Sequence, residues 1–100
     1  MFEINGIFYT VKFNKKKIKT VELVTKTSIT AEIAQNNGML RYQTLESLFS
    51  LALVEEATNE VVKQTKAIEI FDKLVEVNGL LTTNKAVVEK FQEDMGFMFR

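Results

Sequence analysis

A chain of 100 residues is long enough for one hydrophobic core and too short for two, so we expect a single domain over residues 1–100. Its content of 46% hydrophobic and 26% charged residues matches soluble globular domains and excludes wholesale disorder. Cysteine and histidine are both absent, which excludes disulfides and thiolate metal sites and removes the commonest metal ligand and the usual base of a serine nucleophile.

The formal net charge is zero, but the charges are unevenly distributed along the chain. Residues 1–27 carry six lysines and two glutamates, a net charge of +4, and the rest of the chain carries a net charge of −4. Such an asymmetry can orient self-association or guide a charged partner. The alternative is a solvated helix face whose charges are balanced by neighbouring side chains.

No apolar run approaches the roughly 18 to 20 residues that span a bilayer. The first residues, Met1-Phe2-Glu3-Ile4, also lack the basic flank and the apolar stretch of a secretory signal. We therefore expect a cytoplasmic protein that does not contact a membrane.

The sharpest local signal is Asn5-Gly6, because this dipeptide accepts the positive φ angles of a two-residue type I′ hairpin turn. The turn fixes the register of two strands, with Ile4 opposite Ile7, and gathers apolar side chains on one face. That face comprises Phe2, Ile4, Ile7, Tyr9, Val11 and Phe13, with Phe2 opposite Tyr9. Since a two-stranded ribbon is barely stable alone, helices or a partner must cover this face.

Asn14 is a natural N-cap for the first of four or five short helices, over residues 15–26. Its apolar residues at helical spacing are Ile18, Val21, Leu23 and Val24. A second helix begins after Thr27 or Ser28 and ends near Gly38, a residue type that tolerates the left-handed conformation. Its apolar residues are Ile29, Ile33 and Ala34.

The third helix follows Thr44 and is expected to be the central element of the core, because its apolar residues form one continuous stripe. They are Leu45, Leu48, Phe49, Ala52 and Leu53. Residues 55–63 lose this pattern and predict a polar connection, in which Val61 and Val62 are also compatible with the extension of a helix on either side.

Thr65 opens a fourth helix, which Gly79 closes in the C-cap position. Its apolar stripe is Ile68, Phe71, Leu74 and Val75. Thr82 or Thr83 opens a fifth helix, which Gly96 ends. Its inward-facing residues are Val87, Val88, Phe91 and Met95.

These elements predict an α+β fold that is mostly α-helical, with a β-hairpin over residues 1–13, a helical body over 14–95 and an apolar tail over 96–100. Because chain ends usually fray and are usually polar, the large apolar side chains of this tail need an explanation. Burying each contributes about 1.5 to 3 kcal/mol, enough to dock the tail on its own body or on another molecule. The candidate protein-binding residues are Phe91, Phe97, Met98 and Phe99.

A second candidate feature is the lysine cluster at the start of the first predicted helix. The candidates for electrostatic contact are Lys15, Lys16, Lys17 and Lys19. Basic helix starts of this kind contact phosphates in many nucleic-acid-binding proteins, so a small nucleic-acid-binding regulator is the alternative function. Against it stand the neutral net charge, the presence of only two arginines and the lack of a helix face rich in Arg, Asn and Gln that reads base edges.

The acidic residues indicate neither a catalytic site nor a metal site. Glu55 and Glu56 are adjacent, so they diverge by about 100° on a helix and do not converge as a catalytic pair, and Glu93 and Asp94 are similar. Each glycine fits a turn or a helix end, and none belongs to a phosphate-binding loop. We therefore expect a protein-binding module that is not an enzyme and needs no cofactor or metal.

The order of the elements and several stretches resemble the small tail assembly chaperones of long-tailed (siphovirus-type) phages and prophages of Gram-positive bacteria. The similar stretches are the hairpin with Asn5-Gly6 and Tyr9, Val11-Lys12-Phe13-Asn14, Asn37-Gly38-Met39-Leu40, Leu45-Glu46-Ser47-Leu48-Phe49 and Gly96-Phe97-Met98-Phe99-Arg100. They span nearly the whole chain and carry no catalytic residue.

This resemblance implies a protein that coats the long helical tape-measure protein in the cytoplasm of the host bacterial cell. It would keep that protein soluble before tail-tube assembly and help to recruit tail-tube subunits. Apolar stripes on short helices suit this role, because they accept an amphipathic partner helix in a groove. Self-association is expected as well, since the opposite charges of the first quarter and the remainder can meet head to tail.

Overall fold

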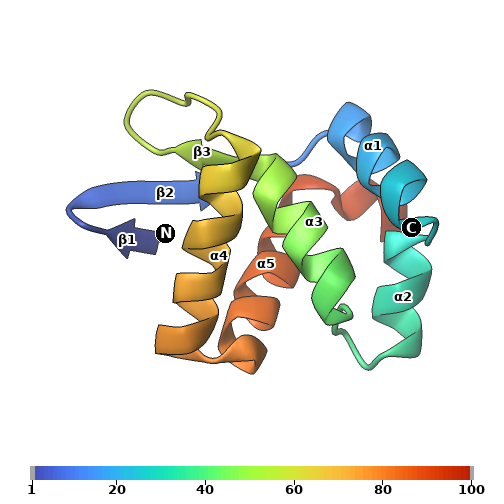
Figure 1. Cartoon of the computed structure of the whole chain (residues 1–100). Coiled ribbons are helices and arrows are strands. Elements are labelled where there is room, and N and C mark those ends of the chain that lie inside the picture. The colour runs from blue at the N-terminus through green and yellow to red at the C-terminus, as the bar shows by residue number, and fades with distance from the viewer. Residues whose placement is uncertain (1, 100) are drawn as a thin grey trace.

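The computed structural model describes residues 2–99 and has the α+β, mostly helical fold that the sequence predicts. In this part of the chain a three-stranded antiparallel sheet, in the order β1-β2-β3, is combined with five α-helices (Figure 1). The strands are β1 (Phe2–Ile4), β2 (Ile7–Val11) and β3 (Leu53–Glu55). The helices are α1 (Lys15–Thr25), α2 (Ile29–Gln35), α3 (Tyr42–Ala52), α4 (Gln64–Asn78), α5 (Leu80–Asp94) and the 3-10 helix η1 (Gly96–Phe99).

The predicted hairpin turn and its register are confirmed. Asn5 and Gly6 both have positive φ angles, 53° and 82°, and Phe2 pairs with Tyr9. Helices cover the predicted apolar face over most of its length, and its buried members are Phe2, Tyr9, Val11 and Phe13. Ile7, next to the turn, is 39% exposed, because the tip of the hairpin projects beyond the helices (Figure 1).

The sequence does not predict β3, which follows α3 without a break. Leu53 continues the apolar stripe of α3, but the helix ends at Ala52 and Leu53 pairs with Val11. This pairing satisfies backbone groups of β2 that would otherwise form an open sheet edge. Val61 does not extend a helix either, since it forms an isolated antiparallel bridge with Val54.

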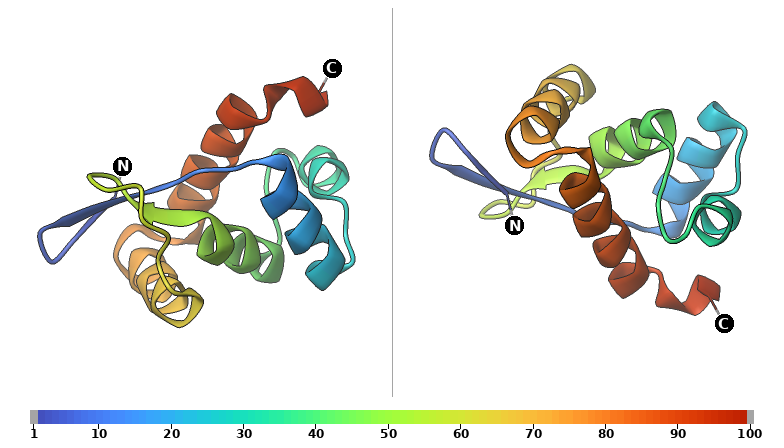
Figure 2. Two further views of the ribbon diagram at one scale, coloured as in Figure 1. Left: turned by 90° about the horizontal axis from the view of Figure 1, so that it is seen from above. Right: turned by 90° about the horizontal axis from the view of Figure 1, so that it is seen from below.

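The third predicted helix is the centre of the core, and α3 lies between α1 and α4 (Figure 1). The fully buried residues of its stripe are Leu45, Leu48, Phe49 and Ala52. The ring of Phe49 lies 5.3 Å from that of Phe71 in α4 and 5.7 Å from that of Phe2 in β1. Most of α5 lies on the other side of β2 from α3 and α4 (Figure 2), where Phe91 packs edge-on against Phe13.

The first helix buries a narrower stripe than the sequence predicts. Asn14 is its N-cap, and the side-chain oxygen accepts a backbone hydrogen bond from the first turn at 2.9 Å. Ile18 and Val21 are buried, but Leu23 and Val24 are 78% and 70% exposed, so only part of the apolar set at helical spacing packs against the core. Successive helix positions diverge by about 100°, and a helix at the edge of a fold buries only the stripe that faces its neighbours.

Two helices begin earlier than the sequence predicts. Helices α3 and α5 start at Tyr42 and Leu80, and neither has a side-chain N-cap. The threonines that resemble caps lie inside these helices, where Thr83 donates its hydroxyl proton to the carbonyl of Gly79 at 2.9 Å. Gly79 alone separates α4 from α5, with a φ of 84° and a ψ of 155°.

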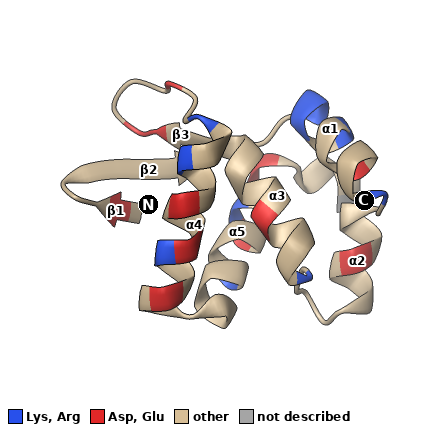
Figure 3. Cartoon of the chain, in the orientation of Figure 1, with Lys and Arg blue, Asp and Glu red and all other residues tan. Residues whose placement is uncertain are grey.

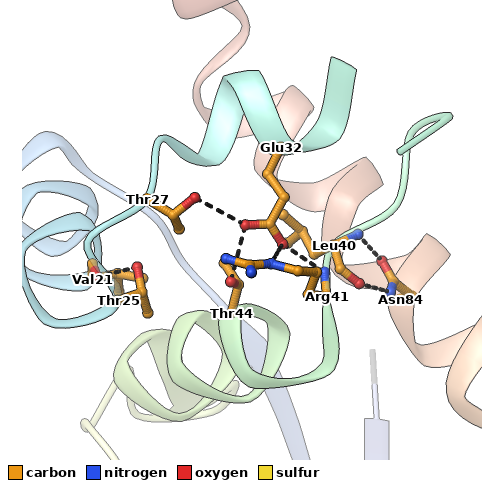
Figure 4. Close-up of polar contacts among 8 residues, drawn as sticks. All are labelled: Val21, Thr25, Thr27, Glu32, Leu40, Arg41, Thr44 and Asn84. Atoms are coloured by element: carbon orange, nitrogen blue, oxygen red, sulfur yellow. Dashed lines mark hydrogen bonds and ion pairs between the residues drawn. The ribbon is translucent and has the colours of Figure 1, made fainter. Parts of the chain in front are cut away.

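Glu32 of α2 is a buried carboxylate that fixes the start of α3 (Figure 4). It accepts hydrogen bonds from the backbone N–H of Arg41 at 2.6 Å and from the hydroxyls of Thr27 and Thr44 at 3.3 and 3.1 Å. The guanidinium Nε of Arg41 lies 3.4 Å from the same carboxylate. Burial raises the pKa of Glu32, but the hydrogen bonds from Arg41 and Thr44 outweigh burial, and the net pKa lies below the usual range.

A second buried side chain, Asn84 of α5, holds the segment between α2 and α3 from the opposite side (Figure 4). Its Oδ1 accepts from the N–H of Leu40 at 3.0 Å, and its Nδ2 donates to the carbonyl of Leu40 at 2.7 Å. Both backbone groups of a buried loop residue are thus satisfied by one side chain, which ties this loop to α5.

Candidate functional site

The predicted apolar tail forms η1, and its side chains have different surroundings. The N–H of Met98 donates to the carbonyl of Met95 at 2.9 Å, and the half-buried side chain of Met98 packs against the core. Phe97 is 48% exposed. The side chain of Phe99 and residue 100 lie outside the described part of the chain. Met98 therefore helps to complete the core, whereas about half of Phe97 remains on the surface.

Phe91 does not lie on the surface with Phe97. It is fully buried in α5, with its ring edge-on to Phe13 at a centroid distance of 5.6 Å. In this conformation Phe91 cannot contact another protein, so its assignment as a protein-binding residue is corrected to a core residue. The same apolar stripe that makes α5 a helix explains this placement.

Three of the four predicted lysines are on the exposed side of α1. Lys15, Lys16 and Lys19 are exposed, and the ammonium nitrogen of Lys15 lies 5.4 Å from the centre of the Phe97 ring. This is cation–π geometry. Four of the six lysines of the first quarter therefore lie on one helix, α1 (Figure 3), whose start is in contact with the tail.

Lys17 has different surroundings from its neighbours. It is half-buried, and its Nζ donates to the carbonyl of Lys12 at 2.9 Å. Burial and the charge of Lys12 lower the pKa of Lys17, and the carboxylate of Asp94 partly opposes them. Lys17 thus serves the packing between α1 and the preceding strand rather than the exposed lysine surface.

The predicted lysine and tail residues meet in a shallow groove of about 290 Å³ between α1 and η1. We call it the α1–tail groove, and it is lined by Lys15, Ile18, Lys19, Glu22, Phe97 and Met98. Its apolar part comes from Ile18, Phe97 and Met98, and its rim carries the lysines. The structure thus joins two features that are separated by most of the sequence.

Two lining residues of the α1–tail groove, Ile18 and Glu22, are not predicted as site residues. The helical spacing of Lys15, Ile18, Lys19 and Glu22 places them on one side of α1, which is the sequence signal that identifies them. The carboxylate of Glu22 has a structural partner, because its Oε2 accepts the N–H of Ile29 at the start of α2 at 2.8 Å. Glu22 remains an anion, so the two lysines and this carboxylate give the groove a net charge of +1.

Other surfaces also expose apolar side chains. An apolar patch at the turn between α4 and α5, away from α1 (Figure 1), contains Val77, Leu80 and Leu81, and we call it the α4–α5 patch. A hollow of about 280 Å³ between the hairpin and α4 is lined by Ile4, Asn5, Ile7, Tyr9, Lys66, Glu69, Ile70 and Lys73. Two lysines and one glutamate line this hollow, the same charged set as in the α1–tail groove, but no exposed aromatic ring of the described tail residues lies beside it.

The chemistry that the α1–tail groove offers is that of a binding surface, with an exposed aromatic ring, aliphatic side chains and ammonium groups. Among residues 2–99, no group of three or more Asp or Glu side chains is arranged to hold a metal ion. Nor does any helix of the described chain have the length and apolar character to cross a membrane.

Comparison of the chain with protein-family models, with curated proteins and with solved structures finds no match. The functional conclusion therefore depends on the geometry of the α1–tail groove and on the sequence features described above.

Proposed function

We propose that this chain is a tail assembly chaperone of a long-tailed phage or prophage, a non-enzymatic module of the host cytoplasm that binds the tape-measure protein and keeps it soluble. The observation that supports this proposal best is the α1–tail groove, in which an exposed aromatic ring, buried aliphatic side chains and a lysine rim meet. The stretches that resemble this family include Gly96-Phe97-Met98, which forms one wall of the groove.

The groove suits a helical partner for a physical reason. A partly exposed aromatic side chain next to aliphatic ones is typical of the residues that contribute most to binding free energy. An amphipathic helix binds such a surface through apolar side chains one turn apart. Leu23, which is 78% exposed and one turn after Lys19 on α1, extends the apolar surface beyond the groove. A tape-measure protein, being long and helical, would offer many segments of this kind.

Recruitment of tail-tube subunits and self-association are also part of the proposal. The α4–α5 patch lies far from the α1–tail groove (Figure 1), so a second protein can contact it while the groove is occupied. The lysine-rich first quarter and the net-acidic remainder favour contacts between copies in a head-to-tail orientation.

Co-expression tests the proposal. The large helical protein encoded beside this chain should be found in the soluble fraction and co-purify with the chain, and should precipitate when expressed alone. Phe97→Asp should abolish co-purification, because it places a charge in the apolar part of the groove. Val61→Asp, at a 69% exposed position outside the groove, is the matched control and should leave co-purification intact. Equal solubility with and without the chain, and no co-purification, would refute the proposal.

The alternative, a nucleic-acid-binding regulator, is favoured by the three exposed lysines of α1. It predicts that DNA or RNA is retarded at low salt, and that retardation falls steeply with salt and is lost when Lys15, Lys16 and Lys19 are changed together to glutamate. We expect no retardation, because the net charge is zero and three of the six residues that line the groove are apolar. Salt-sensitive retardation that depends on these lysines would replace the chaperone proposal.

A further inference from the structure

We infer that the α1–tail groove selects an amphipathic helix that carries acidic side chains beside one large apolar side chain. This inference rests on the proposed function for the presence of a helical protein partner, and it adds the chemistry of the segment that is bound. It depends on the size of the groove, the charges on its rim and the positions of the lysines along α1.

The size of the groove indicates a single anchoring side chain. Its volume of about 290 Å³ is at the lower end of the range of about 300 to 1,000 Å³ that is common for ligand sites. Ile18 is 3% exposed, Met98 is half-buried, and Phe97 stands exposed beside them. One large apolar side chain of a partner can therefore lie against Phe97 and Met98, above the buried Ile18 at the base of the groove, with its helix resting on the rim.

The lysines on the rim of the groove favour a partner with negative charge. Lys15 and Lys19 are one helical turn apart, so their ammonium groups lie on the same side of α1. Glu22 already accepts the N–H of Ile29, which directs its carboxylate toward the start of α2. A partner helix with glutamate or aspartate on either side of its anchor would meet the lysines, whereas a partner with lysine there would be repelled.

Lys15 has a further role in this arrangement. Its ammonium nitrogen lies 5.4 Å from the centre of the Phe97 ring, so the positive charge is held at the mouth of the groove in the unbound chain. A lysine that is already held at this position loses less conformational freedom when an acidic partner binds.

An acidic helical peptide is a better match than a nucleic acid. Both would supply negative charge, but the groove wall is built from Phe97, Met98 and Ile18, and two lysines line it. Grooves that bind single-stranded nucleic acid combine a continuous basic track with several stacking aromatic rings. Phe97 is the one aromatic residue that lines this groove in the described part of the chain.

Two synthetic helical peptides of equal length and with the same apolar stripe provide the probe. One has glutamate beside the stripe and the other has lysine, and each is labelled for fluorescence anisotropy with the full chain. We expect the acidic peptide to bind at least about tenfold more tightly at low salt, and this preference to shrink as the salt concentration rises.

Matched pairs of variants test whether the peptides bind at the α1–tail groove. Lys19→Glu should abolish or reverse the preference for the acidic peptide, whereas Lys85→Glu, at an exposed lysine of α5, should leave it unchanged. Phe97→Ala should lower the affinity for both peptides about tenfold or more. Leu81→Ala, at a 57% exposed position of the α4–α5 patch, should leave both affinities unchanged. Circular dichroism checks that each variant keeps its helices.

The inference is wrong if both peptides bind equally, or if the two lysine variants behave alike. It is also wrong if a DNA or RNA oligonucleotide displaces the acidic peptide and itself depends on Lys19. In each case the neighbouring large protein can still co-purify, so the proposed function is judged separately by co-expression. Loss of co-purification without loss of peptide selectivity would remove the proposed partner and leave the acidic-helix site.

Discussion

Glu32 is the residue whose removal should cost the most stability outside the apolar core. It is 4% exposed and accepts hydrogen bonds from the backbone of Arg41 and from the hydroxyls of Thr27 and Thr44. Glu32→Ala leaves these donors without their acceptor, and the free energy of unfolding should fall by about 2 to 3 kcal/mol in urea denaturation. Glu89→Ala, at an exposed position of α5, is the control and should change the free energy of unfolding by less than about 0.5 kcal/mol.

The same carboxylate makes a predictable contribution to acid sensitivity. Hydrogen bonds from Arg41 and Thr44 outweigh the raising effect of burial, so the pKa of Glu32 in the folded chain is below its value of about 4.3 in an unfolded chain. The ionised carboxylate therefore stabilises the fold fully above the unfolded pKa, and this stabilisation is lost as the pH falls through the folded pKa. Between about pH 5 and pH 3 the wild-type chain should lose stability more steeply than Glu32→Gln, which cannot titrate. Urea denaturation at several pH values in this range measures how the free energy of unfolding of each chain changes with pH. The same pH dependence for both chains would contradict the prediction.

At the scale of elements, the single residue between α4 and α5 determines how these two helices meet. Gly79 has a φ of 84° and a ψ of 155°, a conformation that is almost confined to glycine. A Cβ at this position would meet no atom within 4 Å, so the cost of Gly79→Ala is backbone strain of about 1 to 3 kcal/mol. Gly96→Ala is the matched control, because its Cβ is equally unobstructed and its φ is not positive. Thermal or urea unfolding measures the stability of both variants. If Gly79→Ala and Gly96→Ala lose the same free energy of unfolding, the strain argument is wrong.

Elements that depend on local chemistry could be predicted from the sequence. The Asn5-Gly6 turn fixes the hairpin register within its own residues, and Ser28 caps α2 by accepting from the N–H of Ala31. The strand β3 could not be predicted in this way, because Leu53 fits the apolar stripe of the preceding helix equally well. Its extended conformation is decided by pairing with Val11, a partner that is distant in the sequence.

At the scale of the whole molecule, four of the six residues that line the candidate site could be predicted as site residues, but the contact between α1 and the tail could not. Phe97 and Lys15 each stand out in the sequence, one as an apolar residue near an end and the other as a charge near a helix start. The fold places η1 beside the start of α1, so that the ammonium nitrogen of Lys15 lies 5.4 Å from the centre of the Phe97 ring, and no local pattern contains this information. The burial of Phe91, by contrast, follows from the apolar stripe of α5, which already predicts it as an inward-facing residue, and only its ring partner Phe13 is distant in the sequence.

The last prediction concerns the charge asymmetry of the whole molecule. Six lysines lie in the first quarter of the chain, and the basic start of α1 lies on the other side of the molecule from the α4–α5 turn, beside which α4 carries exposed acidic residues (Figures 1 and 3). A contact between the start of α1 in one copy and the α4–α5 patch in another is heterologous, so each complex keeps one free surface of each kind and can add further copies.

The mass from light scattering should therefore rise with protein concentration at low salt and fall toward that of one chain as salt screens the charges. Leu81→Lys should reduce association, because it removes apolar surface and places a positive charge opposite the lysines of the second copy, and Val61→Lys should not. A constant mass of one chain at every concentration and salt level would show that the two surfaces do not associate.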